Sequence, residues 1–253
     1  MEFTWDVTLF IFLAQFLAYT VKWLIGFGNP LISAPLLSLR LDNTLITPGT
    51  LLPDLCVNTC IVWQNRKHFD WRRILPMLLA MMAGVIPGTW LLRFSMPWVV
   101  KTALGLVVAF LGLEMAARKL RTARPSRRRE ENPAARYLAA FFSGVCSGLF
   151  GIGLFLVAYL QRTARDYEEF KGSICFLFWG ENLFRLALYC GSGMLDAACL
   201  QFSLISGAAL LVSYGIARLL SGHIRNDTLE KLAIALFILG GVNITVRSLL
   251  LHA

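Results

Sequence analysis

The chain has 253 residues, of which 57% are hydrophobic and only 15% are charged. Soluble globular domains carry about 25% charged residues, so this composition excludes an ordinary soluble enzyme or binding domain. The formal net charge of +9 comes largely from loops between apolar segments, and eight of the 24 Lys and Arg residues lie between Arg118 and Arg136. Basic clusters beside apolar segments orient membrane proteins, so we interpret the charge in this way and expect no nucleic-acid partner.

Apolar segments fill almost the whole chain, and most are long enough to cross about 30 Å of hydrocarbon at roughly 20 residues per helix. They cover residues 6–39, 44–63, 74–92, 97–117, 134–161, 171–190, 197–217 and 229–251. The N-terminus lacks the basic region of a signal peptide, so we expect the first segment to be retained. The pattern predicts an all-α, multi-pass membrane protein without a soluble catalytic domain.

Glycines interrupt the first and fifth segments in similar sequences. FGNPL at Phe27–Leu31 matches FGIGL at Phe150–Leu154 at an offset of 123 residues, from Gly28 to Gly151, and the same offset relates Gly84 to Gly207. This predicts two internal repeats of about four segments each, over residues 1–117 and 134–253, joined by a basic cytoplasmic linker at 118–133. Interruptions at matching positions of two repeats indicate the binding site of a transporter.

The interrupted segments either cross the membrane once or return to the side from which they enter. Single crossings place nine basic residues outside the cytoplasm: Arg40, Arg93, Lys101, Arg162, Arg165, Lys171, Arg218, Arg225 and Lys231. Hairpins place four there, Arg40, Arg93, Lys101 and Arg247. The cytoplasmic excess of Lys and Arg favours the hairpins, which make the repeats inverted and put both termini outside. Parallel repeats with single crossings are the alternative.

The interruptions themselves have features of an anion site. Asn29 is a preferred N-cap residue and Pro30 suits the first helical position, so a half-helix is expected to start here with its positive end at the interruption. Such an end binds anions without a formal charge. Gly28, Gly151 and Gly153 let the backbone approach a ligand closely. The alternative is that these glycines only allow tight helix packing.

Ionisable residues inside apolar segments are costly and are functional by default. Lys22, Asp54, Glu181 and Arg185 are such residues, and Glu181 matches Asn58 at the offset of 123. The other interpretations are that Lys22 extends to the membrane surface and that Glu181 and Arg185, four apart, form a structural ion pair. The predicted binding residues are Lys22, Gly28, Asn29, Pro30, Asp54, Asn58, Gly151, Gly153, Glu181 and Arg185.

The six cysteines form no CxxC motif and lie mostly inside apolar segments, where we expect buried thiols that act as small hydrophobes. Cys56 and Cys60 share a helical face, so the alternative function is a membrane thiol–disulfide electron-transfer protein that uses this pair. The sequence has no nucleotide-binding loop, metal-spaced His/Cys set or catalytic triad. We therefore predict no enzyme activity, no cofactor and no metal.

Two stretches resemble the TauE/SafE family of sulfite exporters. They are GFGNPLISAP at Gly26–Pro35 and GLFGIGLFLV at Gly148–Val157, and the basic linker and overall length agree as well. Asn29 and Pro30 stand where the family usually has glycines, and Ala158 replaces the second proline. The resemblance implies a small permease that moves sulfite, sulfonates or related anions across the bacterial cytoplasmic membrane.

Together these observations predict a permease for a small anion, either sulfite, a sulfonate or a related organosulfur anion. We expect alternating access with the site at the membrane midplane, between the two repeats. The coupling ion is predicted to be a proton, with Asp54 or Glu181 as its carrier, or a sodium ion.

Overall fold

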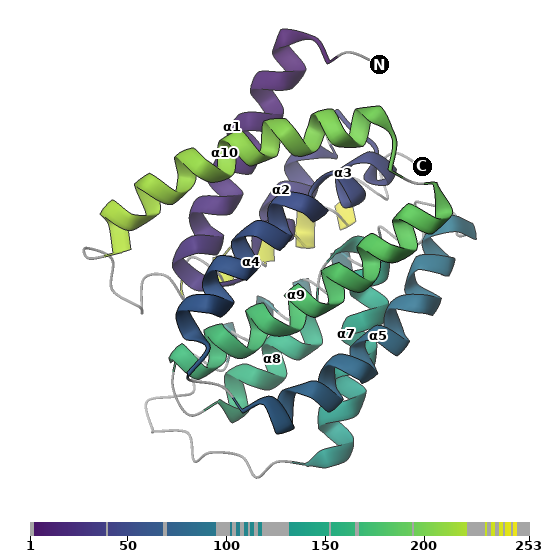
Figure 1. Cartoon of the computed structure of the whole chain (residues 1–253), viewed down its shortest axis with the longest axis vertical. Coiled ribbons are helices and arrows are strands. Elements are labelled where there is room, and N and C mark those ends of the chain that lie inside the picture. The colour runs from purple at the N-terminus through teal and green to yellow at the C-terminus, as the bar shows by residue number, and fades with distance from the viewer. Residues whose placement is uncertain are drawn as a thin grey trace.

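The computed structural model describes residues 3–38, 40–67, 70–94, 132–151, 153–164, 167–193 and 195–221, with scattered residues between 102 and 117 and between 231 and 246. Within these ranges the fold is all-α, as predicted, and contains no strand (Figure 1). The helices are α1 (Trp5–Ile25), α2 (Asn29–Leu37), α3 (Asn43–Gly49), α4 (Leu51–Asn65), α5 (Trp71–Phe94), α7 (Pro133–Phe150), α8 (Leu154–Thr163), α9 (Tyr167–Ser192) and α10 (Ala197–Ser221).

Four described stretches are long and apolar enough to cross a membrane. They are Trp5–Ile25, Leu45–Asn65, Trp71–Leu91 and Ala197–Leu220. The predicted segments at 97–117 and 229–251 and the linker at 118–133 lie largely outside the described residues. Large apolar side chains on the outer surface, such as Leu204, Leu211 and Leu219 of α10, are 70–75% exposed. Lipid tails are the environment in which such exposure costs nothing.

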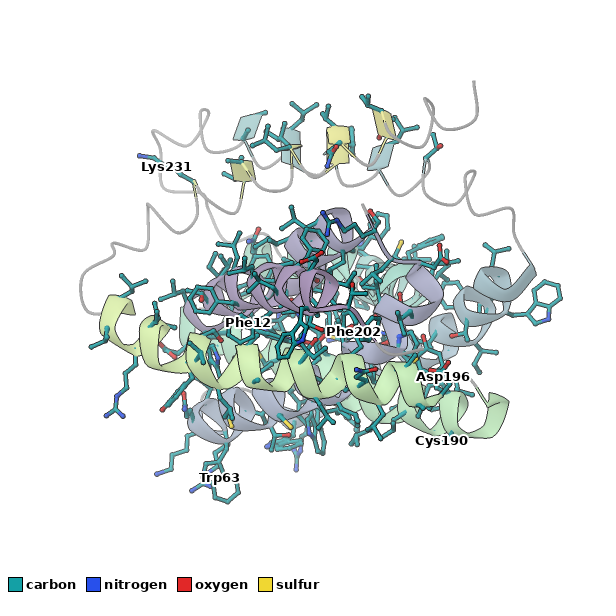
Figure 2. All side chains as sticks on the ribbon, turned by 90° about the horizontal axis from the view of Figure 1, so that it is seen from above. Phe12, Trp63, Cys190, Asp196, Phe202 and Lys231 are labelled. Atoms are coloured by element: carbon teal, nitrogen blue, oxygen red, sulfur yellow. The ribbon has the colours of Figure 1, made fainter. Side chains whose placement is uncertain are left out.

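Tryptophans lie near the ends of the long helices. Trp5 begins α1, Trp63 lies in the last turn of α4, and Trp71 and Trp90 lie near the two ends of α5; all are exposed. Trp63 points away from the bundle (Figure 2). Tryptophan is enriched at membrane–water interfaces because its ring is apolar and its N–H needs a polar partner. This arrangement is typical of a multi-pass membrane protein.

Both glycine segments lie between two helices. Gly26 and Gly28 separate α1 from α2 with φ of +91° and +96°, and Gly151 ends α7 with φ of +73°. Glycine adopts this left-handed backbone without the steric penalty that other residues incur. Leu37, at the end of α2, packs with Ile11 and Ala14 of α1, so α2 turns back along α1.

The second pair of helices makes the same kind of turn. The Leu156 N–H in the first turn of α8 donates to the Ser143 hydroxyl of α7 at 2.6 Å, and the rings of Phe142 and Phe155 lie 6.1 Å apart. These contacts place the start of α8 against the middle of α7. Each glycine segment is therefore the tip of a short helical hairpin.

The long helices pack in pairs that join the two halves of the sequence. α1 packs against α10, α5 against α7, and α4 against α9 (Figure 1). Between α5 and α7 the contact is backbone to backbone, because a Cβ on Gly84 or Gly88 would collide with α7 and one on Gly144 or Gly148 would collide with α5. Close packing therefore explains these glycines. The α4–α9 contact lies beside both hairpin tips and positions the polar residues described next.

Candidate functional site

A buried cavity lies where the two hairpin tips meet α4 and α9. Most of the predicted binding residues line it: Lys22, Gly28, Pro30, Asp54, Asn58, Gly151, Gly153 and Glu181. Phe27, Leu31, Val157, Phe178 and Asn182 complete the lining. The cavity volume is about 30 Å³. A buried water needs roughly 10–15 Å³ by this measure, so the space suits a ligand of only a few atoms.

Lys22 is held inside the protein by Asp54. Its ammonium lies 2.7 Å from Asp54 Oδ1, and Lys22 is only 3% exposed. The Asn29 amide donates to the same carboxylate oxygen at 2.8 Å. Lys22 is thus paired and does not extend to the membrane surface. The prediction of Asn29 as N-cap was wrong: α2 has Gly28 at its N-cap, and the Asn29 side chain binds Asp54 instead.

Arg185 and Glu181 form the ion pair that their spacing suggested. Arg185 Nε lies 3.5 Å from Glu181 Oε1, and both side chains are almost fully buried. The guanidinium also donates to the Tyr189 hydroxyl, from Nη2 at 3.0 Å and from Nε at 3.3 Å. A Cβ on Gly151 would lie 3.6 Å from Arg185 Nη1, so the cation lies directly beside the second hairpin tip.

Arg185 lines a second, smaller cavity that adjoins the first. Its volume is about 10 Å³, and Ser33, Thr47 and Thr50 contribute hydroxyl groups to its wall. The two cavities share four lining residues, Pro30, Asp54, Gly151 and Asn182. The predicted site is therefore divided, with Lys22, Asn58 and Glu181 in one chamber and Arg185 in the other.

Several polar atoms at the larger cavity have no hydrogen-bond partner. Both side-chain polar atoms of Asn58 and Oε1 of Glu181 are buried and accept or donate no hydrogen bond within the described part of the chain. Buried polar groups in proteins are nearly always hydrogen-bonded, and exceptions at a cavity indicate a missing ligand or water. The site thus offers an unused amide donor and unused oxygen acceptors.

Residues of α9 that sequence reasoning missed support the first hairpin tip. The Lys171 ammonium donates to the Trp23 carbonyl at 3.0 Å, and the Cys175 thiol donates to the Gly26 carbonyl at 3.1 Å. These bonds satisfy carbonyls at the end of α1, which have no partner within the helix. Asn182 was also missed, although a polar residue next to Glu181 in an apolar segment is a usable signal. Lys171 and Cys175 gave no such signal.

The thiols do not converge on the site. Cys56 and Cys60 are free and exposed, as is Cys190, so the expectation of buried thiols holds only for residues such as Cys175 and Cys199. Neither Cys56 nor Cys60 lines either cavity. The thiol–disulfide alternative therefore receives no support from the site. Among the described residues, no group of three or more His, Cys, Asp and Glu side chains is arranged to hold a metal ion.

Apolar helices of spanning length around a buried, charged cavity define a multi-pass membrane protein. A family model described as "Sulfite exporter TauE/SafE" matches residues 11–244, so the chain belongs to the TauE/SafE family of membrane transporters. No curated protein and no solved structure matches the chain.

Proposed function

We propose that the protein carries a small oxyanion, sulfite or a small sulfonate, across the cytoplasmic membrane by alternating access. The anion is held in the larger cavity, between the two hairpin tips. The observation that carries this proposal is the convergence of both tips, Lys22 and the unpaired Asn58 on one buried space. No catalytic step is required, because the substrate leaves chemically unchanged.

The hairpin tips supply positive helix ends for the anion. Gly28 precedes α2 and Gly153 precedes α8, and both glycines line the cavity. Pro30 has no N–H, and the Leu31 and Leu156 N–H groups already donate to the Gly28 carbonyl and the Ser143 hydroxyl. The contribution of the two helix ends is therefore chiefly the positive end of each helix dipole, which favours an anion between them. Asn58 Nδ2 adds a side-chain donor that is not used within the protein.

The packing of the helices supports two repeats related by a twofold axis, and the positive-inside count favours their inverted form. The offset of 123 residues relates α1 to α7, α4 to α9 and α5 to α10. Exchanging the halves converts the α1–α10 contact into the α7–α5 contact and leaves the α4–α9 contact in place, as a twofold axis between α4 and α9 would. Hairpins that enter from opposite faces then meet at the midplane, where the site lies.

The adjoining cavities suggest how access alternates. The larger one contains Lys22 and the smaller one contains Arg185, and Pro30 and Gly151 belong to the walls of both. A small shift of the two tips against α4 and α9 would connect the anion first to one cavity and then to the other. Rocking of one repeat against the other around a fixed site produces such a shift.

Counterflow in proteoliposomes tests the proposal. Vesicles loaded with sulfite, thiosulfate, methanesulfonate or acetate are diluted into labelled anion, and accumulation identifies the substrates. Asn58→Leu should weaken uptake roughly tenfold to 100-fold, because a donor to a charged group contributes about 1.5–3 kcal/mol. The folded protein should remain stable, since the variant removes buried polar atoms that have no partner.

Asn65→Leu is the matched control. Asn65 lies two turns further along α4, is also buried, and donates to the Ile61 carbonyl without lining either cavity. Its replacement should leave substrate affinity unchanged. Equal loss of affinity in both variants, or no counterflow of any anion in the panel, would contradict the proposed site and function respectively.

A further inference from the structure

The charges of the described residues that line the two cavities cancel. Lys22 and Arg185 face Asp54 and Glu181, and all four residues are at most 7% exposed. With every group ionised, the cluster has no net charge. An anion that entered this cluster would leave one uncompensated negative charge inside the membrane, which is costly. Binding therefore needs an additional positive charge that arrives with the anion.

The two carboxylates differ in how firmly their ionised forms are held. Asp54 Oδ1 accepts hydrogen bonds from Lys22 and from Asn29, at 2.7 and 2.8 Å. Glu181 Oε1 meets Arg185 Nε at the longer distance of 3.5 Å, and the carboxylate also interacts with the Ser147 hydroxyl of α7. Short hydrogen bonds to a carboxylate favour its ionised form, so protonation should cost less free energy at Glu181 than at Asp54.

Asn58 is suited to a carboxyl group that changes its protonation state. Asn58 and Glu181 line the same small cavity, and both side-chain polar atoms of Asn58 are unpaired. An amide accepts a hydrogen bond through its oxygen and donates one through its nitrogen. It therefore serves a protonated carboxyl group as acceptor and an ionised one as donor. Glu181 occupies the position in the second half that corresponds to Asn58 in the first half, at the offset of 123 residues.

The surroundings of Glu181 contain few other titrating groups. The charged or titratable residues near it in the described part of the chain are Arg185 and Tyr189 of α9, Asp54 of α4 and Lys22 of α1. The helices α5, α7 and α8 bring no charged side chain to the lining of the cavity. Of the two described carboxyl groups at the site, Glu181 is thus the one whose known contact with a cation is longer, at 3.5 Å against 2.7 Å for Asp54.

We propose that Glu181 binds one proton with each anion, so that the protein is a proton-coupled symporter of singly charged anions. The inference rests on the proposed function. The proton comes from water on the side of entry, adds to the carboxylate without any electron transfer, and returns to water on the side of release. While Glu181 is protonated, Lys22 and Arg185 face Asp54 alone, and the remaining positive charge balances one negative charge on the substrate.

A metal cation fits the larger cavity less well than a proton on Glu181 does. Among the side-chain oxygens of the described cavity wall, those without a hydrogen bond are Asn58 Oδ1 and Glu181 Oε1. Hard cations take six or more oxygen ligands, as Ca²⁺ does in proteins, whereas a proton needs a single oxygen. The geometry therefore favours a proton over sodium as the coupling ion.

The test measures binding of methanesulfonate to the purified protein between about pH 5 and pH 8. Methanesulfonate is the anion of a strong acid, so any pH dependence belongs to the protein. Affinity should fall with rising pH, by up to about tenfold per pH unit for one coupled proton. Glu181→Gln should bind with the low-pH affinity at every pH. In vesicles it should exchange methanesulfonate but show no uptake driven by a pH gradient.

Two variants make the assignment specific. Glu181→Asp keeps a titrating carboxyl group and should retain a pH slope. Glu169→Gln removes another buried acid of α9, one that pairs with Arg73 at 3.1 Å and lines neither cavity, and should keep the parental slope.

Each contrary outcome has a distinct meaning. If the affinity of the parent protein does not change with pH, proton coupling is overturned, but the anion site is not. A slope that survives in Glu181→Gln overturns the role of Glu181. Uptake that follows a sodium gradient in place of a pH gradient assigns the coupling to sodium and overturns the proposal. Failure to bind any anion of the panel instead overturns the proposed function itself.

Discussion

Lys22 shows what makes a charged residue tolerable in an apolar helix. Its ammonium contacts Asp54, which in turn accepts a hydrogen bond from Asn29 at the start of the next helix. The three side chains come from α1, α2 and α4, so the contact fixes the first hairpin tip against α4. Breaking one member of a buried pair leaves a charge without compensation, which costs far more than the pair contributes.

A double-mutant cycle tests this contact. Lys22→Gln should destabilise the folded protein by about 3–5 kcal/mol, because it leaves Asp54 ionised and buried beside only Asn29. Adding Asp54→Asn removes the stranded charge and should restore much of the loss. The measurement is the thermal unfolding midpoint in detergent. A double variant that is no more stable than Lys22→Gln would show that Asp54 is not the partner of Lys22.

The two ion pairs differ in how far the sequence predicts them. Glu181 and Arg185 lie one helical turn apart, so their pairing follows from helix geometry. Lys22 and Asp54 are 32 positions apart, and their contact depends on how α4 packs against the first hairpin. The rule that intramembrane charges find partners predicts that Lys22 is paired, but it does not choose among the acids.

At the scale of elements, the α5–α7 contact depends on residues without side chains. Gly84 and Gly88 of α5 lie against the backbone of α7. Gly144 and Gly148 of α7 likewise lie against the backbone of α5. Small residues four apart let membrane helices approach closely, and the resulting packing replaces the hydrophobic driving force that lipid removes. The same face therefore tolerates no larger side chain.

Gly84→Val should destabilise the protein by about 1–3 kcal/mol or more, because its side chain would collide with the Phe141 carbonyl. Gly207→Val is the matched control: Gly207 occupies the equivalent place in the second half, but nothing lies within 4 Å of the Cβ position. Unfolding midpoints of the two purified variants provide the comparison. Similar midpoints would contradict the close contact between α5 and α7.

The glycine pattern predicts where helices end better than how they are capped. The paired motifs place the interruptions where α1 and α7 stop. The predicted capping role of Asn29 was nonetheless wrong, because its side-chain amide donates a hydrogen bond to the Asp54 carboxylate instead. The local N-cap preference of asparagine is overridden here by a tertiary hydrogen bond to a charged group. Sequence spacing does not reveal that contact.

At the scale of the whole molecule, the distribution of basic residues predicts the orientation of the chain. If both hairpins return to the side from which they enter, basic residues between the segments at 44–63 and 74–92 and in the linker at 118–133 lie in the cytoplasm, and both termini lie outside. Single crossings would instead place both termini inside. Cysteines introduced at Phe3 and at His252, which lies outside the described residues, should react with an impermeant maleimide on intact cells. The background lacks the exposed Cys56, Cys60 and Cys190. Protection of both introduced cysteines would contradict the hairpin arrangement.

Helices of the first half pack mainly against helices of the second half, and this affects how the protein folds during synthesis. The helix α5 packs against α7, and α1 packs against α10, so each half completes the other. During synthesis the first half enters the membrane before its partners exist, and the glycine face of α5 stays uncovered until α7 follows. A chain that stops after the linker is an unfinished product that membrane proteases should remove, whereas two separately expressed halves should find and stabilise each other.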